Sequence, residues 1–410
     1  MSSHRRVGRR APLAGVGTTV LALVLLPLAV LGADWSAAGR VSRLGGARLD
    51  SLHQLSAGRD MLHLVHPRIG SGRSDDRVVY QRSGVDGTSW SAERTLFSST
   101  GKLRHVIPNL ALDASGRTVV VAWRVRGTDE TTLVVRVSRD GGATFAERRT
   151  IVSSGHRHGI GVPAVAIGND VVAVAWTNRA NGKINVRVSR NGGSTFRPAR
   201  TLGRTRLSID CRKRVSDGLV GLAATDRLLH VAWSHAPRRS CIAGSIRMRS
   251  SSDRGSSWKP RRTVTSRRSY GWPELDARGG TVVATVQSPG GGVVVAHSGR
   301  NGRRWSDRLL KARRGFSLSA ADVVLLPRGR AMITYVQERV RRAKLIDTRL
   351  VSRLSPDSGR RFKPARTVVD RARRLRMAPN IASNGGPVIV VYQSGALDGS
   401  PRDLWVSRLR

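Results

Sequence analysis

Short runs of apolar residues, separated by glycine-rich turns, recur along most of the chain. Some runs are almost wholly apolar, as in Val119–Trp123 and Val388–Tyr392, whereas others alternate apolar and polar residues, as in Leu133–Val137. Runs of this length and pattern are typical of buried and half-buried β-strands. Each repeating unit contains about four such runs, so we predict an all-β protein built from four-stranded sheets.

An eight-residue phrase, in its fullest form Ser-x-Asp-x-Gly-x-Thr-aromatic, follows the alternating strand of each unit. Four full copies are Ser138–Phe145, Ser189–Phe196, Ser251–Trp258 and Ser355–Phe362. Two degenerate copies are Ser83–Trp90 and Ser298–Trp305, and a seventh is split between Leu404–Ser407 and Trp35–Ser36. Because the copies recur about every 50 residues, we predict a seven-bladed β-propeller over residues 34–410. The N-terminal strand is expected to close the last blade, which removes the open sheet edges.

The phrase itself is predicted to be structural. A side-chain oxygen in a tight turn accepts hydrogen bonds from nearby backbone N–H groups, and glycine supplies the positive φ. The oxygen ligands are too few for a calcium loop of the EF-hand kind. The residues expected to hold these turns together are Asp140, Asn191, Asp253 and Asp357.

The first 33 residues have the composition of an export segment. Four arginines within residues 5–10 precede an uncharged, Leu- and Val-rich stretch over residues 11–33. This pattern is typical of a signal peptide, which we expect to be cleaved after Ala33. The alternative is an uncleaved membrane anchor formed by residues 11–33. In either case the propeller is expected to be secreted or held at the extracellular surface.

The two cysteines are Cys211 and Cys241. In an exported chain an isolated pair usually forms a disulfide, which is the prediction here. The chain has no Gly-x-Ser-x-Gly, His-Glu-x-x-His or Gly-Lys-Ser/Thr motif, so neither a cofactor nor a metal site is predicted.

The charge of the chain is strongly positive. There are 72 Lys and Arg against 27 Asp and Glu, a formal net charge of +45, which predicts attraction to polyanions. Many arginines fall in loops expected on the propeller face opposite the phrase turns, among them Arg268, Arg314 and Arg374. Guanidinium groups suit carboxylate, sulfate and phosphate ligands. The alternative is that arginine is scattered over both faces without a common function. Few aromatic residues are left over for stacking on bases, so no specific nucleic-acid partner is predicted.

The repeated phrase resembles the Asp-box, or BNR repeat, of sialidases and related propellers. That resemblance covers residues 34–410 and implies a propeller fold. Sialidases hold the substrate carboxylate with three arginines and use a Tyr–Glu nucleophile pair with an Asp acid/base. The resemblance places Arg48 at one of these arginines, Asp75 or Asp76 at the acid/base, and Glu274 near the glutamate. Arg68 stands where the family has the arginine of a Glu-x-Arg sequence.

Other parts of the family pattern are missing. The place of a second arginine is taken by Gln287, and no tyrosine opens the inner strand of a late blade, although Tyr270 lies close to Glu274 in the sequence. Sialidases usually have six blades, whereas seven are predicted here. Without these parts, covalent glycoside catalysis lacks its nucleophile and most of its anion clamp.

We therefore expect a monomeric binding protein whose basic loop face recognises an acidic polysaccharide, sialoglycan or cell-wall polymer. The residues expected to bind it are Arg48, Arg68, Arg268, Arg314 and Arg374. The alternative is a divergent exo-α-sialidase or related glycoside hydrolase that uses Arg48, Asp75 or Asp76, and Glu274. A protein-binding scaffold is a third possibility.

Overall fold

The computed structural model describes residues 34–43, 53–69, 76–99, 105–155, 159–206, 219–236, 244–341, 344–369, 374–396 and 403–409. Residues Trp35–Arg410 form one compact unit. Every regular element in the described segments is a β-strand. Those segments contain no helix with the length and apolar character needed to cross a membrane.

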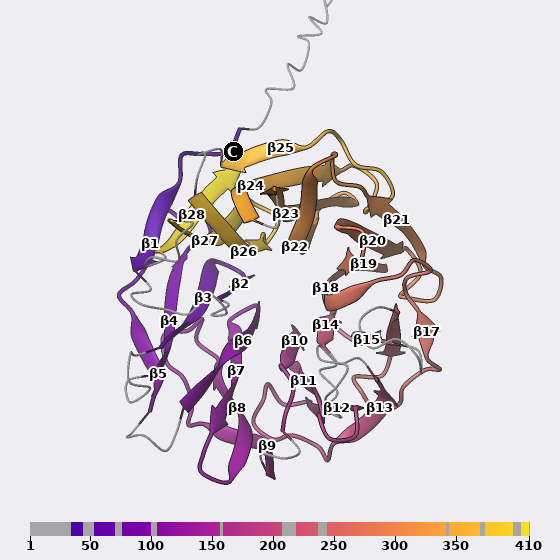
Figure 1. Ribbon diagram of the computed structural model, residues 1–410. Helices are drawn as coiled ribbons and strands as arrows, with labels where there is room; N and C mark the ends of the chain where they lie inside the picture. The colour runs from indigo at the N-terminus through magenta and orange to yellow at the C-terminus, as the bar shows by residue number, and fades with distance from the viewer. Residues whose placement is uncertain are drawn as a thin grey trace, which may run out of the picture. The chain divides into compact units, whose positions relative to one another are not determined.

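Seven four-stranded antiparallel sheets, the blades, form a ring (Figure 1), which confirms the predicted seven-bladed propeller. In blades 1 to 6 the strands follow chain order from the inner edge outward. Blade 1 consists of β2 (Gln54–Ala57), β3 (Met61–Arg68), β4 (Arg77–Gly84) and β5 (Arg94–Ser98), and blade 2 of β6 (His105–Ser115), β7 (Thr118–Arg126), β8 (Glu130–Ser138) and β9 (Arg149–Gly155). Blade 3 consists of β10 (Ala164–Gly168), β11 (Val171–Thr177), β12 (Lys183–Ser189) and β13 (Arg200–Arg204), and blade 4 of β14 (Val220–Ala224), β15 (Leu229–His235), β16 (Ser245–Ser251) and β17 (Arg262–Thr263).

The remaining blades complete the ring. Blade 5 consists of β18 (Tyr270–Arg278), β19 (Thr281–Ser288), β20 (Gly292–Ser298) and β21 (Ser306–Leu310), and blade 6 of β22 (Phe316–Leu326), β23 (Arg330–Arg341), β24 (Lys344–Ser355) and β25 (Arg366–Val369). Blade 7 has the order β26 (Arg374–Ala382), β27 (Val388–Ala396), β28 (Asp403–Leu409) and β1 (Gly39–Arg43). The N-terminal strand is therefore the outer strand of the last blade, as predicted. It pairs antiparallel with β28, with Gly39 opposite Val406 and Arg43 opposite Asp403.

The core lies between the faces of neighbouring blades. The apolar runs that predicted the second strands are almost wholly buried, and Trp123 and Trp233 have no exposed surface. Trp123 of blade 2, for example, belongs to one apolar cluster with Val65 and Tyr80 of blade 1. Because each blade buries both faces, the continuous Val-rich pattern replaces simple alternation in these strands.

The four full copies of the eight-residue phrase, hereafter boxes, form the same turn. In Ser138–Phe145, Asp140 Oδ1 accepts from Ser138 Oγ (2.7 Å) and from the backbone N–H of Thr144 (2.8 Å). The N–H of Gly142, with φ of 79°, donates to Ser138 Oγ at 2.8 Å. The N–H at position 7 of the box also donates to the side chain at position 3 in the pairs Thr195–Asn191 (3.0 Å), Ser257–Asp253 (2.9 Å) and Arg361–Asp357 (2.7 Å).

Arginines at the second position of two boxes join successive blades. Arg139 donates to the backbone oxygens of Asn191 (3.2 Å) and Gly192 (3.4 Å) in the next box. Arg190 donates in the same way to the backbone oxygens of Asp253 and Arg254, both at 3.1 Å. These bonds cross the gap between blades where no sheet ladder does.

Each blade has two ends, which the strand registers distinguish. In blade 5, Tyr270 at the start of β18 pairs with Gln287, whereas Ala277 near the end of β18 pairs with Val282, which pairs with Ser298. Ser298 begins the degenerate box, so the box turns lie at the opposite end of the strands from the entrance of the inner strand. We call these the box end and the loop end.

Candidate functional site

The seven inner strands line a central cavity of about 450 Å³. Alternate residues of a strand point to the same side, and several of those that line the cavity are polar. Blades 3 and 4 contribute small and apolar residues such as Ala164 and Gly221. The polar residues come from the other five blades and are Gln54, Ser56, Asp113, Ser115, Glu274, Asp276, Arg278, Asp322, Asn380 and Ser383. The cavity is therefore rich in carboxyl groups, although the chain as a whole is strongly basic.

The three aspartates that line the cavity connect neighbouring inner strands. Asp276 of β18 accepts from its own neighbour's N–H, that of Ala277 (2.7 Å), and from the N–H of Leu325 on β22 (2.6 Å). The same arrangement joins Asp113 to Ala114 and Ile167, and Asp322 to Val323 and Ile381. The inner edge of a blade has no further strand to pair with. These carboxylates therefore satisfy backbone donors that would otherwise face the cavity.

Burial is the main influence on the pKa values of these aspartates. It raises the pKa of Asp113 and of Asp276 to about 6, against the opposing effect of the backbone hydrogen bonds. Since hydrogen bonds from N–H groups favour the charged form, both groups are ionised at neutral pH.

Glu274, whose backbone pairs with that of Thr285, differs from the aspartates because its carboxyl group makes no hydrogen bond with any described residue. Burial, followed by the charge of nearby Asp322, raises its pKa well above the usual range. Asp322 accepts hydrogen bonds from two backbone N–H groups and from Asn380 Nδ2 at 3.4 Å, so its charged form is the better stabilised of the pair. At neutral pH we therefore assign the proton to Glu274 and the charge to Asp322. Half-buried Trp272 lines the same cavity two residues before Glu274.

Tyr270 and Glu338 lie at the loop end of blades 5 and 6. Burial, and then the charge of Glu338, raises the pKa of Tyr270. Glu338 accepts from Ser317 Oγ (3.2 Å) and Ser319 Oγ (2.5 Å) on β22. The tyrosine is therefore kept as a neutral phenol beside a fixed carboxylate.

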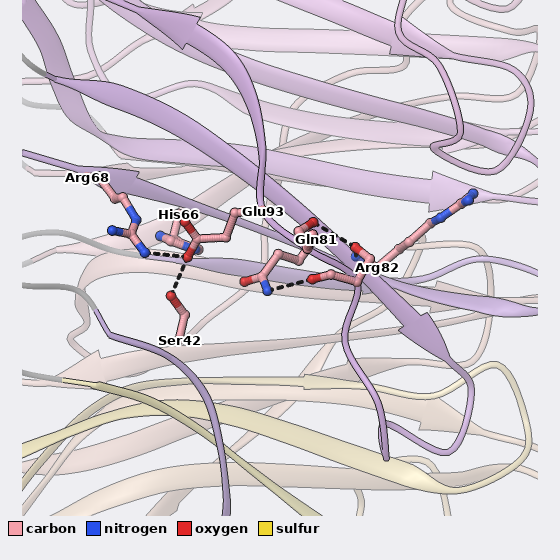
Figure 2. Close-up of polar contacts among 8 residues, drawn as sticks. Ser42, His66, Arg68, Gln81, Arg82 and Glu93 are labelled. Carbon is pink, nitrogen blue, oxygen red and sulfur yellow. Dashed lines mark hydrogen bonds and ion pairs between the residues drawn. The ribbon is translucent and has the colours of Figure 1, made fainter.

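A second polar cluster lies between blade 1 and the closing strand β1 (Figure 2). Glu93 Oε1 accepts from Ser42 Oγ of β1 and from Arg68 Nη2, both at 2.6 Å. Burial raises the pKa of Glu93, but these two hydrogen bonds outweigh it, so the net pKa is below the usual value. His66 Nε2 lies 3.8 Å from the same oxygen, and burial lowers the pKa of His66 to about 4. Figure 2 shows Arg82 pointing away from this group.

The predicted site residues do not converge on one centre. Glu274 lines the cavity, whereas Arg68 ends β3 in the blade 1 cluster and Asp76 lies buried just before β4, neither of them lining the cavity. Arg268 and Arg314 are exposed two residues before β18 and β22. Arg374 begins β26, and its side chain lies outside the description. Arg48, Asp75, Cys211 and Cys241 lie outside the described residues.

Sequence reasoning missed three features of these sites. Asp322 and Asn380 lie on the inner strands β22 and β26, directly after β-bulges between Ser319 and Asp322 and between Met377 and Asn380, and these bulges change which side chains face the cavity. Glu93 gave no signal because its partners are distant in the sequence. Within the described residues no group of three or more His, Cys, Asp or Glu side chains could hold a metal ion.

Comparison with known proteins places the fold but not the activity. No family model matches the chain, and no curated protein matches its sequence. Among solved structures, phage phi92 endosialidase is similar with a TM-score of 0.51 at 10% identity, covering 91% of this chain and 69% of that chain. The NanB sialidase from Streptococcus pneumoniae has a TM-score of 0.51 at 11% identity, covering 92% and 70%. A protein of unknown function from Dyadobacter fermentans has a TM-score of 0.50 at 15% identity, covering 91% and 99%.

These similarities agree with the Asp-box turns and with the closed ring of four-stranded blades. At such low identity they carry the fold alone. The chain therefore has the fold of a seven-bladed β-propeller, and this fold is similar to that of the sialidase structures.

Proposed function

We propose that the protein recognises an acidic glycan at the loop end of blades 5 and 6. Two observations carry this proposal. Trp272, Glu274 and Asp322 line the central cavity, and the inner strands of blades 5 and 6 begin close to exposed arginines. A half-buried aromatic ring with a few polar groups around it is the usual composition of a sugar site. The protonated Glu274 would donate a hydrogen bond to a sugar hydroxyl, and Asp322 would accept one.

The arginines supply the preference for an acidic sugar. Arg268 and Arg314 each precede an inner strand that lines the cavity, and both are exposed. Arg339, near the end of β23, lies over the ring of Phe316, with its Cζ atom 5.9 Å from the ring centroid. These guanidinium groups would bind the carboxylate, sulfate or phosphate substituents of a glycan. An extracellular or secreted location, as the N-terminal segment suggests, would bring the protein to such polymers.

The test is binding of sialylated and uronic-acid oligosaccharides to the full chain, measured by calorimetry at two salt concentrations. Trp272→Ala should abolish binding, and Arg268→Ala with Arg314→Ala should weaken it by about tenfold and reduce its salt dependence. The matched control is Arg360→Ala with Arg361→Ala, which removes the same charge from the box end and should leave affinity unchanged. Equal losses in both double variants would mean that net charge alone drives binding, which contradicts the proposal.

A second candidate, glycoside hydrolysis, is favoured by the paired carboxyls Glu274 and Asp322. Two carboxyl groups whose environments separate their pKa values are the arrangement of a general acid with an ionised partner. Turnover of a fluorogenic sialoside by the wild-type chain, lost in Glu274→Gln without loss of glycan binding, would support it. Absence of turnover by a chain that binds the glycan would leave recognition as the function.

A further inference from the structure

The box of blade 5, Ser298–Trp305, has the backbone conformation of a full box but no Asp or Asn at its third position. Asn301 and Gly302 have φ of 51° and 72°, close to the 69° and 79° of Gly141 and Gly142 in the full box of blade 2. Position 3, which is Asp or Asn in the four full boxes, is Arg300. The turn is therefore formed, but the side chain that normally fills it is a cation.

The missing acid changes what the turn offers to solvent. In all four full boxes the N–H at position 7 donates to the position 3 carboxyl or amide oxygen, at 2.7 to 3.0 Å. In blade 5 this N–H belongs to Arg304, and no side-chain oxygen stands at position 3 to accept it. An oxygen from outside the chain can take that place.

The surroundings of this turn are strongly positive. A surface hollow of about 650 Å³ is lined by Asn301 and four arginines, namely Arg262, Arg300, Arg303 and Arg304. All four arginines are exposed, and none forms an ion pair with any residue in the described part of the chain. Arginines of earlier boxes have partners within the protein. Arg139 and Arg190 donate to backbone oxygens of the next box, and Arg254 forms an ion pair with Asp170.

We propose that this hollow binds a tetrahedral oxyanion, the phosphate or sulfate group of a small ion or a polymer. One oxygen accepts from the N–H of Arg304 in the place of the box carboxylate, and the four guanidinium groups surround the others. Backbone N–H groups presented by a turn form concavities that bind anions, and arginine guanidinium groups beside them bind phosphate and sulfate oxygens strongly. The site lies at the box end and is separate from the glycan site proposed at the loop end.

Blade 6 provides a matched control within the same chain. Its box has arginines at the same sixth and seventh positions, Arg360 and Arg361, but it retains Asp357. The N–H of Arg361 already donates to Asp357 Oδ1 at 2.7 Å, and Arg360 Nε donates to His297 Nε2 at 3.2 Å. The two boxes have the same arginines at positions 6 and 7. They differ in whether a side-chain oxygen at position 3 accepts the N–H of position 7.

The experiment is calorimetric titration of the full chain with inorganic phosphate and with inorganic sulfate. Arg303→Ala with Arg304→Ala should weaken phosphate binding by about tenfold or more, whereas Arg360→Ala with Arg361→Ala should change it by less than about twofold. Arg300→Asp should abolish binding by supplying the missing carboxylate. Because Arg300→Asp restores the Asp of the full boxes, it should keep or raise the melting temperature, which separates loss of the site from loss of the fold.

The source of the anion is read from a second ligand, polyphosphate. Binding per phosphate group that is tighter than for inorganic phosphate, and that is lost with the same substitutions, assigns the site to a polymer. Equal affinities assign it to a free anion. No phosphate or sulfate binding by the folded wild type, or equal losses in the blade 5 and blade 6 double variants, would overturn the proposal.

Discussion

Replacing Asp140 tests whether the boxes stabilise the propeller through their side-chain oxygen or through its charge. Asp140→Ala removes the acceptor for the N–H and hydroxyl of Thr144 and for the hydroxyl of Ser138. At about 1 kcal/mol per net hydrogen bond, reduced for partial exposure, the loss is about 2 kcal/mol. Since the unfolding entropy of a domain this size is about 0.8 kcal/mol per degree, the melting temperature should fall by about 2–3 °C.

Asp140→Asn is the informative partner of this variant, because blade 3 already uses an amide at the same position. Asn191 accepts from the N–H of Thr195 at 3.0 Å and donates to Thr195 Oγ1 at 2.9 Å. Asp140→Asn should therefore cost less than about 0.5 kcal/mol at pH 7. Equal destabilisation by Ala and Asn would refute the reasoning, because it would make the negative charge the stabilising feature.

The pH dependence has a defined sign. Hydrogen bonds from Thr144 hold the pKa of Asp140 well below its usual value in the folded state. The stabilisation is therefore complete above the ordinary carboxyl pKa and is lost as the pH falls below about 4. Urea midpoints of wild type and Asp140→Asn should diverge only in that acid range, with the wild type losing stability faster.

Two further predictions concern the inner and outer edges of the blades. Asp276→Asn should speed hydrogen exchange at the N–H of Leu325, measured by NMR or mass spectrometry. Burial raises the pKa of Asp276 to about 6, so between about pH 4 and 6 the native state binds more protons than the unfolded state. The stability advantage of wild type over this variant should therefore shrink as the pH rises from about 4 to 6. No change across that range would contradict a raised pKa for Asp276. Glu93→Ala should destabilise the half-exposed blade 1 cluster by about 1–2 kcal/mol and expose β1 to limited proteolysis, because the hydrogen bond from Ser42 of β1 to Glu93 is lost. Protease resistance of β1 equal to that of wild type would show that pairing with β28 alone holds it.

The fold could be predicted because its signals are local. Each box contains its turn glycine, its hydrogen-bond acceptor and its aromatic residue within eight positions. The pattern that Asp140 and Gly142 exemplify therefore predicts the same turn in each copy. The closing strand could be predicted as well, because Trp35 completes a phrase that Trp405 and Ser407 begin. These inferences needed no knowledge of which face a strand presents.

The interior of the ring could not be predicted in the same way. Which side chain faces the cavity depends on the register, and bulges in β18, β22 and β26 shift it. Nothing in the sequence pattern distinguishes Asp276 from other polar residues, although it joins two blades. The contact of Glu93 with Arg68 is set by the packing of strands that are not neighbours in the sequence, a property that a single sequence does not display.

The pairing of β1 with β28 also constrains how the molecule can be made. Six blades can fold as the chain emerges, since each consists of consecutive strands, but the seventh waits for residues at opposite ends of the sequence. Bringing them together carries the largest loop-closure entropy in the molecule, which places the joining of the ring late and makes it slow. Until then β28 has an open edge, and a second chain could supply the missing strand. The step that closes the ring is thus also the one at which two copies could exchange strands.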